Sequence, residues 1–478
     1  MSSAAVDPVS IGEPVTRGRI AAWSLWDWGS AAFNAVIVTF VFAVYLTDSV
    51  GADLPGGISA NTWLGWTLGI AGFFVAILAP VTGQRADAGG RRKRSLGIWT
   101  VLIVLSMIAM FWVRDDYHYL WLGLVLLGVG SIFFEFASVS YNAMLRQVST
   151  PANIGRVSAF GWSMGYFGGI VLLLICYVGF IAPEVGWFGV TSQAGLNIRI
   201  VALFAAAWFG LFAIPVLVKV PEITGLPRSR RSGFFASYRV LFRDLGTLYR
   251  TDRDTVYFLG ASALFRDGLN AVFAFGAVLA VTVYGISSAD VLIFGVAANV
   301  VSAIGALTAG RFDDRLGPKT VIVVSLIGML IAGTIVLFLS GPTAFWIFGL
   351  ILCLFVGPAQ SSSRTFLARL APPGREGQLF GLYATTGRAV SFLAPMLFGL
   401  FTLVFGADRA GIVGILLVLA AGLAALWPVR PPEIAGRTDE PNAAAGQRGI
   451  TGPAMDHQPQ DPGSPLNGPT TSEVIQPP

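Results

Sequence analysis

Charged and amide side chains lie inside segments of this sequence that are otherwise apolar. In residues 21–46 the carboxylate of Asp27 and the amide of Asn34 are seven positions apart, which places both on one face of a regular helix. A charged side chain near the centre of a bilayer costs at least about 2.5 kcal/mol, so such residues commonly mark a solute or ion pathway. Two polar groups in one apolar segment therefore predict a polar route through a membrane.

Other apolar segments carry comparable groups, and together they form the candidate pathway set. Its members are Asp27, Asn34, Glu135, Asn142, Arg266, Asp267, Asn270, Gln360 and Arg388. We hypothesise that Arg266 holds a solute carboxylate while Asp27 or Glu135 holds an ammonium group or a coupling proton. The alternative for both acids is a structural ion pair, or a bond to the backbone, near a gate.

Neighbouring positions limit how these groups pair. Arg266 and Asp267 are adjacent and about 100° apart around a helix, so they cannot pair face to face. We expect Arg266 to point toward the first or fourth apolar segment and Asp267 toward a neighbour such as Arg388. Arg364 lies near the end of its segment, where an anchor at the membrane surface and a solute contact remain equally open interpretations.

Composition identifies the class of protein that must position these groups. Of the 478 residues 55% are hydrophobic and only 12% are charged, which is typical of a polytopic membrane protein. The only histidines, His118 and His457, lie outside the apolar segments, and Cys176 and Cys353 have no metal-ligand spacing. With no phosphate-binding loop either, the sequence predicts no metal, no cofactor and no enzyme activity.

Apolar runs of about 20 residues, the length that spans a bilayer as a helix, recur along the chain. They fall near 20–47, 61–83, 95–113, 119–145, 157–182, 197–218, 255–284, 289–310, 320–340, 343–368, 378–405 and 409–429. We therefore predict an all-α membrane protein with twelve transmembrane helices. The long polar interval after the sixth run divides them into two groups of six.

Basic residues indicate the orientation, because they gather in alternate loops such as 85–94. The positive-inside rule then predicts that both termini are cytoplasmic. The expected organisation is an N-terminal segment, a six-helix bundle, a linker with an amphipathic helix, a second six-helix bundle and a disordered cytoplasmic tail. The corresponding ranges are 1–19, 20–218, 219–254, 255–430 and 431–478.

An internal repeat supports the division into halves. "GQRADAGGRRKR" follows the second run and "GRFDDRLGPKT" follows the eighth, and the matched positions are separated by a constant 227 residues. We expect the glycines to allow tight turns, and the acid and base of each copy to pair at the cytoplasmic boundary. The matched positions are Gly83, Asp87, Gly90 and Arg92 in the first copy, and Gly310, Asp314, Gly317 and Lys319 in the second.

These two loops resemble the signature loop of the major facilitator superfamily, although Ala88, Pro318 and Thr320 depart from it. The resemblance implies the major facilitator fold, in which two six-helix pseudo-repeats surround a cavity lined by helices 1, 4, 7 and 10. It also implies that the loops form a conformational gate and bind no solute.

Further segments resemble one family within that superfamily, the autophagy-related vacuolar amino-acid effluxers. Residues 27–33 resemble its D-W-[AG]-[NS]-S-A-[FY] element, with a departure in the Ala31-Ala32 pair, where alanine replaces the serine; Arg388 is another departure. The likeness continues through Tyr141-Asn142, "GRVSAFGWSMGYFGG", "LFRDGLNAV" and "QSSSRTFLARLAP". It implies transport of small solutes, with amino-acid efflux proposed for fungal members.

The predicted function is thus secondary active transport of a small solute, with amino-acid efflux and proton coupling as finer hypotheses. Two alternatives are a drug or metabolite efflux pump, and a non-transporting receptor or assembly protein with the same fold. We expect a monomer in the plasma (inner) membrane, with a small solute, protons and lipid as partners. No nucleic acid is expected.

Overall fold

The computed structural model describes residues 15–222 and 234–431, which fall within one compact unit. The regular elements of these residues are helices, apart from one isolated bridge between Val185 and Thr191. Most of the predicted disordered tail, 431–478, lies outside the described residues, as do 1–14 of the N-terminal segment and 223–233 of the linker.

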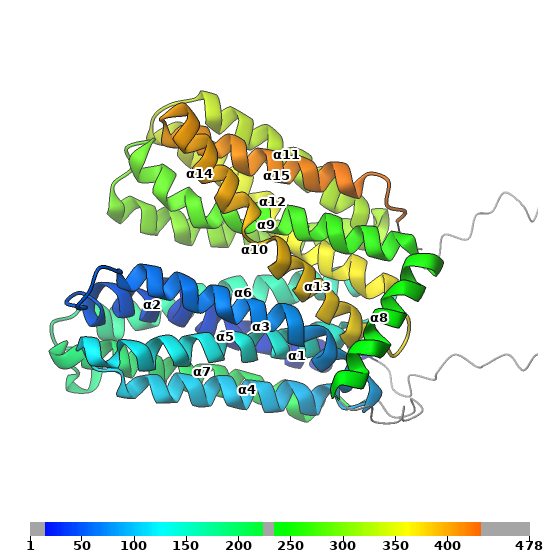
Figure 1. Cartoon of the computed structure of the whole chain (residues 1–478), viewed down its shortest axis with the longest axis horizontal. Coiled ribbons are helices and arrows are strands. Elements are labelled where there is room, and N and C mark those ends of the chain that lie inside the picture. The colour runs from blue at the N-terminus through cyan, green and yellow to red at the C-terminus, as the bar shows by residue number, and fades with distance from the viewer. Residues whose placement is uncertain (1–14, 223–233, 432–478) are drawn as a thin grey trace, which may run out of the picture. The chain divides into compact units, whose positions relative to one another are not determined.

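The first bundle comprises six membrane spans (Figure 1). Its long helices are α1 (Arg17–Ala31), α3 (Ala60–Ala88), α4 (Arg92–Ala109), α5 (Leu120–Ala143), α6 (Ile154–Cys176) and α7 (Leu196–Lys219). The first span continues beyond α1 through η1 (Ala32–Phe40), α2 (Phe42–Tyr45) and η2 (Leu46–Val50). The fifth span ends in η6 (Tyr177–Ile181). Helix α8 (Phe234–Thr251) then leads to the second bundle.

The second bundle also contributes six spans. Its helices are α9 (Arg253–Thr282), α10 (Ser288–Leu316), α11 (Pro318–Phe338), α12 (Pro342–Leu370), α13 (Glu376–Val390), α14 (Leu393–Phe405) and α15 (Gly411–Leu426). By length and composition, twelve helical segments of the described residues can cross a membrane. The prediction of an all-α chain with twelve spans is therefore confirmed.

The first span is not a regular α-helix over its whole length. The segment η1 is π-helical, with Val41 N–H bonded to the carbonyl of Val36 five residues earlier. Because η1 begins between Asp27 and Asn34, the regular α-helix on which the prediction of a shared face rests does not extend beyond Ala31. Short π-helical segments are frequent at functional sites.

The eleventh span is broken into two helices that pack against different halves. Helix α13 lies against α3 of the first bundle, where Thr385 Oγ1 donates to the carbonyl of Ala76 at 2.8 Å. Helix α14 stays with the second bundle, and its Phe398 stacks on Phe275 of α9 at 4.0 Å between ring centroids. The break at Ser391 and Phe392 thus separates a segment that bridges the halves from one that does not.

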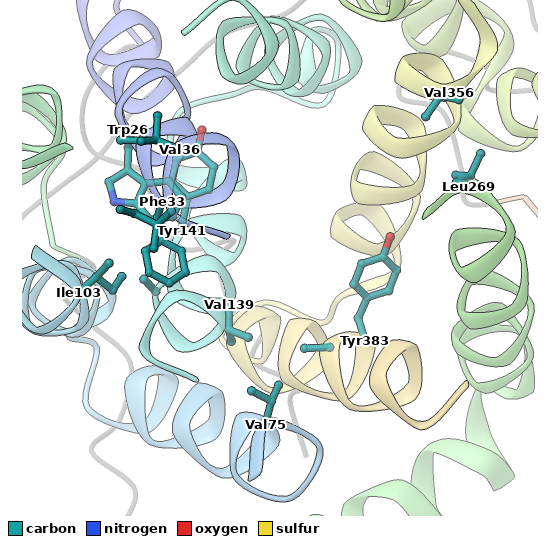
Figure 2. Packing of buried hydrophobic residues seen from close by; sticks show 14 of the residues in the cluster. Trp26, Phe33, Val36, Val75, Ile103, Val139, Tyr141, Leu269, Val356 and Tyr383 are labelled. Atoms are coloured by element: carbon teal, nitrogen blue, oxygen red, sulfur yellow. The ribbon is translucent and has the colours of Figure 1, made fainter. Parts of the chain in front are cut away.

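Aromatic packing fixes the first span in its bundle. Figure 2 shows Trp26 and Phe33 beside Tyr141 of α5, and the rings of Trp26 and Tyr141 stack at 4.4 Å. The indole N–H of Trp26 also donates to Thr100 Oγ1 of α4 at 3.1 Å. Both indole and phenol are buried, so the backbone around Asp27 is held on a rigid face.

The two bundles meet at the end where α3, α5, α7 and α12 finish and where α8 lies, which we call the linker side (Figure 1). Ser158 Oγ of α6 donates to the carbonyl of Ser361 on α12, and Ser163 Oγ of α6 donates to that of Ala303 on α10. At that end Gly83 of α3 also lies directly against the backbone of Gly377 on α13. The described contacts therefore close the linker side.

Candidate functional site

Arg364 of α12 is the centre of a buried polar cluster that joins the two bundles. Its Nη1 lies 3.3 Å from Asp27 Oδ2 on α1 and 3.3 Å from Asn142 Oδ1 on α5. Its Nε and Nη2 donate to Ser158 of α6, to the hydroxyl at 3.0 Å and the carbonyl at 2.5 Å. Asp27 Oδ2 also accepts from the phenol of Tyr141 at 2.8 Å. One cation of the second half is thus bound by three helices of the first.

Aromatic rings complete this Arg364 cluster, which we define as Asp27, Tyr141, Asn142, Ser158 and Arg364. The guanidinium lies within 4.9 Å of the Trp23 ring centroid and within 5.5 Å of that of Trp162, distances suited to cation–π attraction. Arg364 is only 4% exposed and the Asp27 side chain 17% exposed. A buried pair tolerates desolvation only when further hydrogen bonds satisfy both ions, and here Ser158 and Tyr141 supply them.

A separate cavity of about 140 Å³ contains a second pair of opposite charges from the two halves. Glu135 of α5 forms an ion pair with Arg388 of α13. Asn34 also lines this cavity, at a point where η1 replaces α-helix. The remaining lining residues are Phe33, Val38, Leu68, Ala71, Gly72, Val75, Ser131 and Phe134. The cavity therefore combines one carboxylate and one guanidinium with a largely apolar wall.

Arg266 and Asp267 of α9 hold the two parts of the broken eleventh span. Arg266 stacks on Tyr383 of α13, with the guanidinium 3.8 Å from the ring centroid, and donates to its carbonyl at 3.2 Å. Asp267 accepts from the N–H of Ala394 in the first turn of α14 at 2.7 Å. The expectation that Arg266 faces the first or fourth span, and Asp267 faces Arg388, is wrong because Arg266 binds Tyr383 of α13 and Asp267 binds the start of α14.

The remaining predicted pathway residues are less closely connected. Asn142 belongs to the Arg364 cluster, whereas Asn270 is exposed on α9 and Gln360 is half-buried on α12. No side-chain hydrogen bond to Asn270 or Gln360 is present among the described residues. The structure thus brings the other seven predicted residues together in three places, at the Arg364 cluster, in the cavity and along the broken eleventh span.

The first repeat loop binds the start of α13 in the opposite half. Asp87 Oδ2 accepts from the backbone N–H of Gln378 at 2.9 Å, in the first turn of a helix whose own N-cap, Arg375, makes no side-chain cap bond. Arg92 pairs with Asp87 at 2.6 Å and with Glu376 at 2.5 Å. A carboxylate from one bundle thereby satisfies a free amide of a helix in the other bundle and complements the positive end of its dipole.

The second repeat loop makes the reciprocal contact. Asp314 of α10 accepts from Gly155 N at 2.7 Å and from Arg156 N at 3.3 Å, in the first turn of α6. The side chain of Arg156 pairs with the same carboxylate at 2.8 Å. The expected ion pair between Lys319 and Asp314 is absent from the described part of the chain. The Nζ of Lys319 donates to the carbonyls of Trp427 and Val429 beyond α15, where a cation complements the helix C-terminus.

Two glycines of the repeat have a different role from the expected turn. Gly83 and Gly310 lie within α3 and α10, and a Cβ on Gly83 would stand 2.0 Å from the carbonyl oxygen of Gly377. A Cβ on Gly310 would stand 2.7 Å from Ala159. Both glycines therefore allow close contact between halves. The turn positions are Gly90, with φ of 57°, and Gly317, with φ of 88°.

Comparisons with known proteins identify the family. The sequence model of the Atg22-like vacuole effluxers matches residues 146–433, more than half of the chain. The chain belongs to this family. A similar curated protein is the uncharacterized MFS-type transporter YxiO of Bacillus subtilis, 25% identical over 410 residues, which cover 85% of this chain and 93% of that protein.

A fungal member of the family is also similar to this chain. Autophagy-related protein 22-1 of Aspergillus fumigatus is 29% identical over 285 residues, which cover 54% of this chain. The match covers 45% of the fungal protein, so the chain spans less than half the length of this relative.

Solved structures establish the fold of the family member described here. A proton:xylose symporter, XylE, superposes with a TM-score of 0.67 at 14% identity, covering 87% of this chain and 96% of that one. The human organic anion transporter MFSD10 gives a TM-score of 0.66 at 15% identity, with coverage of 87% and 100%. The chain is a multi-pass membrane transporter of the major facilitator fold, as the sequence predicts.

Sequence reasoning missed several residues that carry the contacts between halves. From the sequence, Arg364 fits a surface anchor and a solute contact equally well, yet it is the centre of the buried cluster. Tyr141 and Ser158 stand out in the sequence only as parts of family segments, and Glu376 is not in the candidate pathway set. A signal was available for Glu376, since an acid in the first turn of a helix complements its dipole.

Proposed function

We propose that this transporter moves a small zwitterion, an amino acid, by alternating access of the cavity that contains Glu135 and Arg388. The observation that supports this is the pair of opposite charges, one from each half, within an otherwise mostly apolar cavity. An amino acid carries the complementary ammonium and carboxylate. It can therefore replace the ion pair with two charge-assisted contacts while its side chain meets the apolar wall.

This assignment replaces Arg266 with Arg388 as the residue that binds the solute carboxylate. Arg266 is stacked on Tyr383 and bonded to its carbonyl, whereas Arg388 lines the cavity with Glu135. Because the pair joins the two bundles, a solute that inserts between the two charges removes one contact that holds the halves together. Binding would thereby favour the change of access.

We infer that the linker side faces the cytoplasm, because the basic loops lie there, and that the protein resides in a bacterial-type plasma membrane. In this state the contacts of Arg364, Arg92 and Arg156 close that side. During uptake, solute would enter the cavity from the opposite side while these contacts are formed, and it would leave on the linker side when they break. During efflux the order would be reversed. Proton coupling remains part of the proposal, with the intramembrane carboxylates as the available carriers.

Exchange in proteoliposomes tests the proposal without assuming a coupling ion. Vesicles loaded with an unlabelled amino-acid mixture should accumulate the labelled amino acid that the site accepts. Glu135→Gln and Arg388→Gln each remove one hydrogen bond to a charged group, about 1.5–3 kcal/mol, so exchange should fall roughly 10- to 150-fold. Arg409→Gln is the matched control, because its guanidinium donates to Ser340 and lies over the Tyr284 ring, and it does not line the cavity.

Two results would oppose the proposal. Exchange that is unchanged in both cavity variants would show that the pair does not bind solute. Wild-type exchange of bulky apolar cations in place of amino acids would favour the drug-efflux alternative. Repeating the measurement with and without a pH gradient, and with both loading directions, tests the coupling and the direction.

A further inference from the structure

A groove of about 330 Å³ lies between α1 and α7 near the linker side, apart from the three sites described above. Small residues of α1, including Gly18 and Ala21, form one wall, while Ile214 and Val218 of α7 contribute to the other. Lys219, the last residue of α7, also lines it. The groove is therefore apolar along its length and cationic at one end.

The α7 wall of the groove belongs to the membrane-facing surface of the bundle. Ile214 is 53% exposed and Val218 is 73% exposed, and Leu211 one turn earlier is exposed as well. These residues lie in a span, where large exposed apolar side chains contact lipid chains. The occupant of the groove therefore comes from the bilayer.

The charge at the end of the groove specifies the type of lipid. Lys219 is exposed, and so is Arg17, which immediately precedes Gly18 of the groove. Neither cation has a hydrogen bond or ion pair from its side chain within the described part of the chain. Basic pockets between transmembrane helices bind anionic lipid headgroups, and each cation near the surface contributes to that attraction.

We propose that this groove is a binding site for an anionic phospholipid, with an acyl chain between α1 and α7 and the phosphate beside Lys219 and Arg17. The recessed wall at Gly18 and Ala21 provides space for a chain, because a Cβ on Gly18 would meet only Thr16 Oγ1, at 3.9 Å. The proposal does not depend on which solute is transported. Since α1 continues to Asp27, the lipid would contact the same helix that enters the Arg364 cluster.

Native mass spectrometry of the delipidated full-length protein in detergent micelles tests this site. The protein is offered equimolar phosphatidylglycerol and phosphatidylcholine with identical acyl chains. Two cations should favour retention of phosphatidylglycerol about 25-fold, since each contributes about five-fold. Lys219→Gln should lower that preference about five-fold and Lys219→Arg should keep it. The control Arg315→Gln, an exposed cation on the linker side of the other bundle, should leave it unchanged.

A second variant separates the chain site from the charge. Gly18→Leu with Ala21→Leu fills the groove at two exposed positions, so the protein should fold while retention of both lipids falls. Equal retention of the two lipids by wild type, or unchanged retention in the filled variant, would overturn the proposal. Displacement of phosphatidylglycerol by millimolar inorganic phosphate would overturn it too. Lipid retention that appears only after deletion of residues 1–14 would also overturn the proposal, because that segment would then be the natural occupant of the groove.

Discussion

Replacement of Asp27 by Asn should shift the transporter away from the state in which the linker side is closed. Asp27 and Arg364 are 3.3 Å apart, which corresponds to a gross attraction of about 5 kcal/mol at an effective dielectric constant of about 20. Desolvation offsets part of this, and loss of one partner of a buried pair typically costs about 3–5 kcal/mol. Arg364 keeps Ser158 and Asn142 as acceptors, so we take about 3 kcal/mol.

A cost of about 3 kcal/mol changes the ratio of the state with a closed linker side to the state with an open one roughly 150-fold. A protein that is about 99% closed would become about 40% closed. Arg364→Gln should shift the equilibrium at least as far, because it removes the centre of the cluster and leaves Asp27 with Tyr141 alone. The double variant should shift it by less than the sum, since both changes act on one interaction.

Spin labels on exposed Thr150 and Thr320, one from each half, report this equilibrium on the linker side. The buried Cys176 and Cys353 are replaced by alanine in the background protein. Pulsed electron resonance should then give one short distance for the parent and an additional long distance for Asp27→Asn. The control is Tyr284→Phe, which removes a 2.6 Å hydrogen bond to Val336 within the second half.

An unchanged distance distribution in both Asp27→Asn and Arg364→Gln would refute the reasoning. It would mean that the ion pair contributes no net free energy to closure, as happens when desolvation equals the Coulombic gain. A long-distance population in the Tyr284→Phe control would also refute it, because the shift would then follow from general destabilisation.

Three further changes test the contacts around this cluster. Asp87→Asn should slow turnover about ten-fold or more with little change in KM, because it weakens a cap between halves and leaves the cavity intact. Gly83→Leu should populate the long spin-label distance, since even a Cβ would stand 2.0 Å from the oxygen of Gly377. Asp267→Ala should cost about 1–2 kcal/mol and lower the thermal unfolding midpoint by a few degrees, whereas Asp267→Asn should retain most of the stability because Asn also caps helices.

Each of these changes has an outcome that would count against it. Loss of equilibrium solute binding in Asp87→Asn would place that residue in the binding site. A closed, parent-like distance in Gly83→Leu would mean that α3 and α13 need not approach closely. Equal destabilisation by Asn and Ala at Asp267 would exclude the cap as the source of the stability.

The span count and the fold could be predicted from sequence because bilayer thickness imposes a length that apolar runs display directly. The halves could be predicted because the repeat keeps four positions at constant spacing. The partners of the charged residues within the spans could not, although Asp87 and Arg92 of the first repeat copy pair as expected. Arg364 meets Asp27 across 337 positions of sequence, and the pairing depends on how two bundles dock.

Local irregularities in two helices account for the other differences between the predicted and the observed contacts. A regular helix would place Asn34 with Asp27, but Asn34 lies inside the π-helical segment and lines the cavity, whereas Asp27 lies in the preceding α-helix and pairs with Arg364. The break in the eleventh span likewise turned an expected partnership of Asp267 and Arg388 into two unrelated contacts. Periodicity describes uniform helices, and these two spans are not uniform.

The reciprocal caps have a consequence for how this transporter tolerates sequence change. Asp87 and Asp314 each bind backbone amides of the other bundle, at Gln378 and at Gly155 and Arg156. Almost every amino acid supplies an N–H, so most substitutions at position 378 leave the capping bond in place, while any change at either aspartate removes an acceptor. Deep mutational scanning should therefore find that position 378 tolerates most substitutions, whereas Asp87 and Asp314 tolerate few. The contact between the bundles can therefore persist while the residue that donates the backbone amide is substituted.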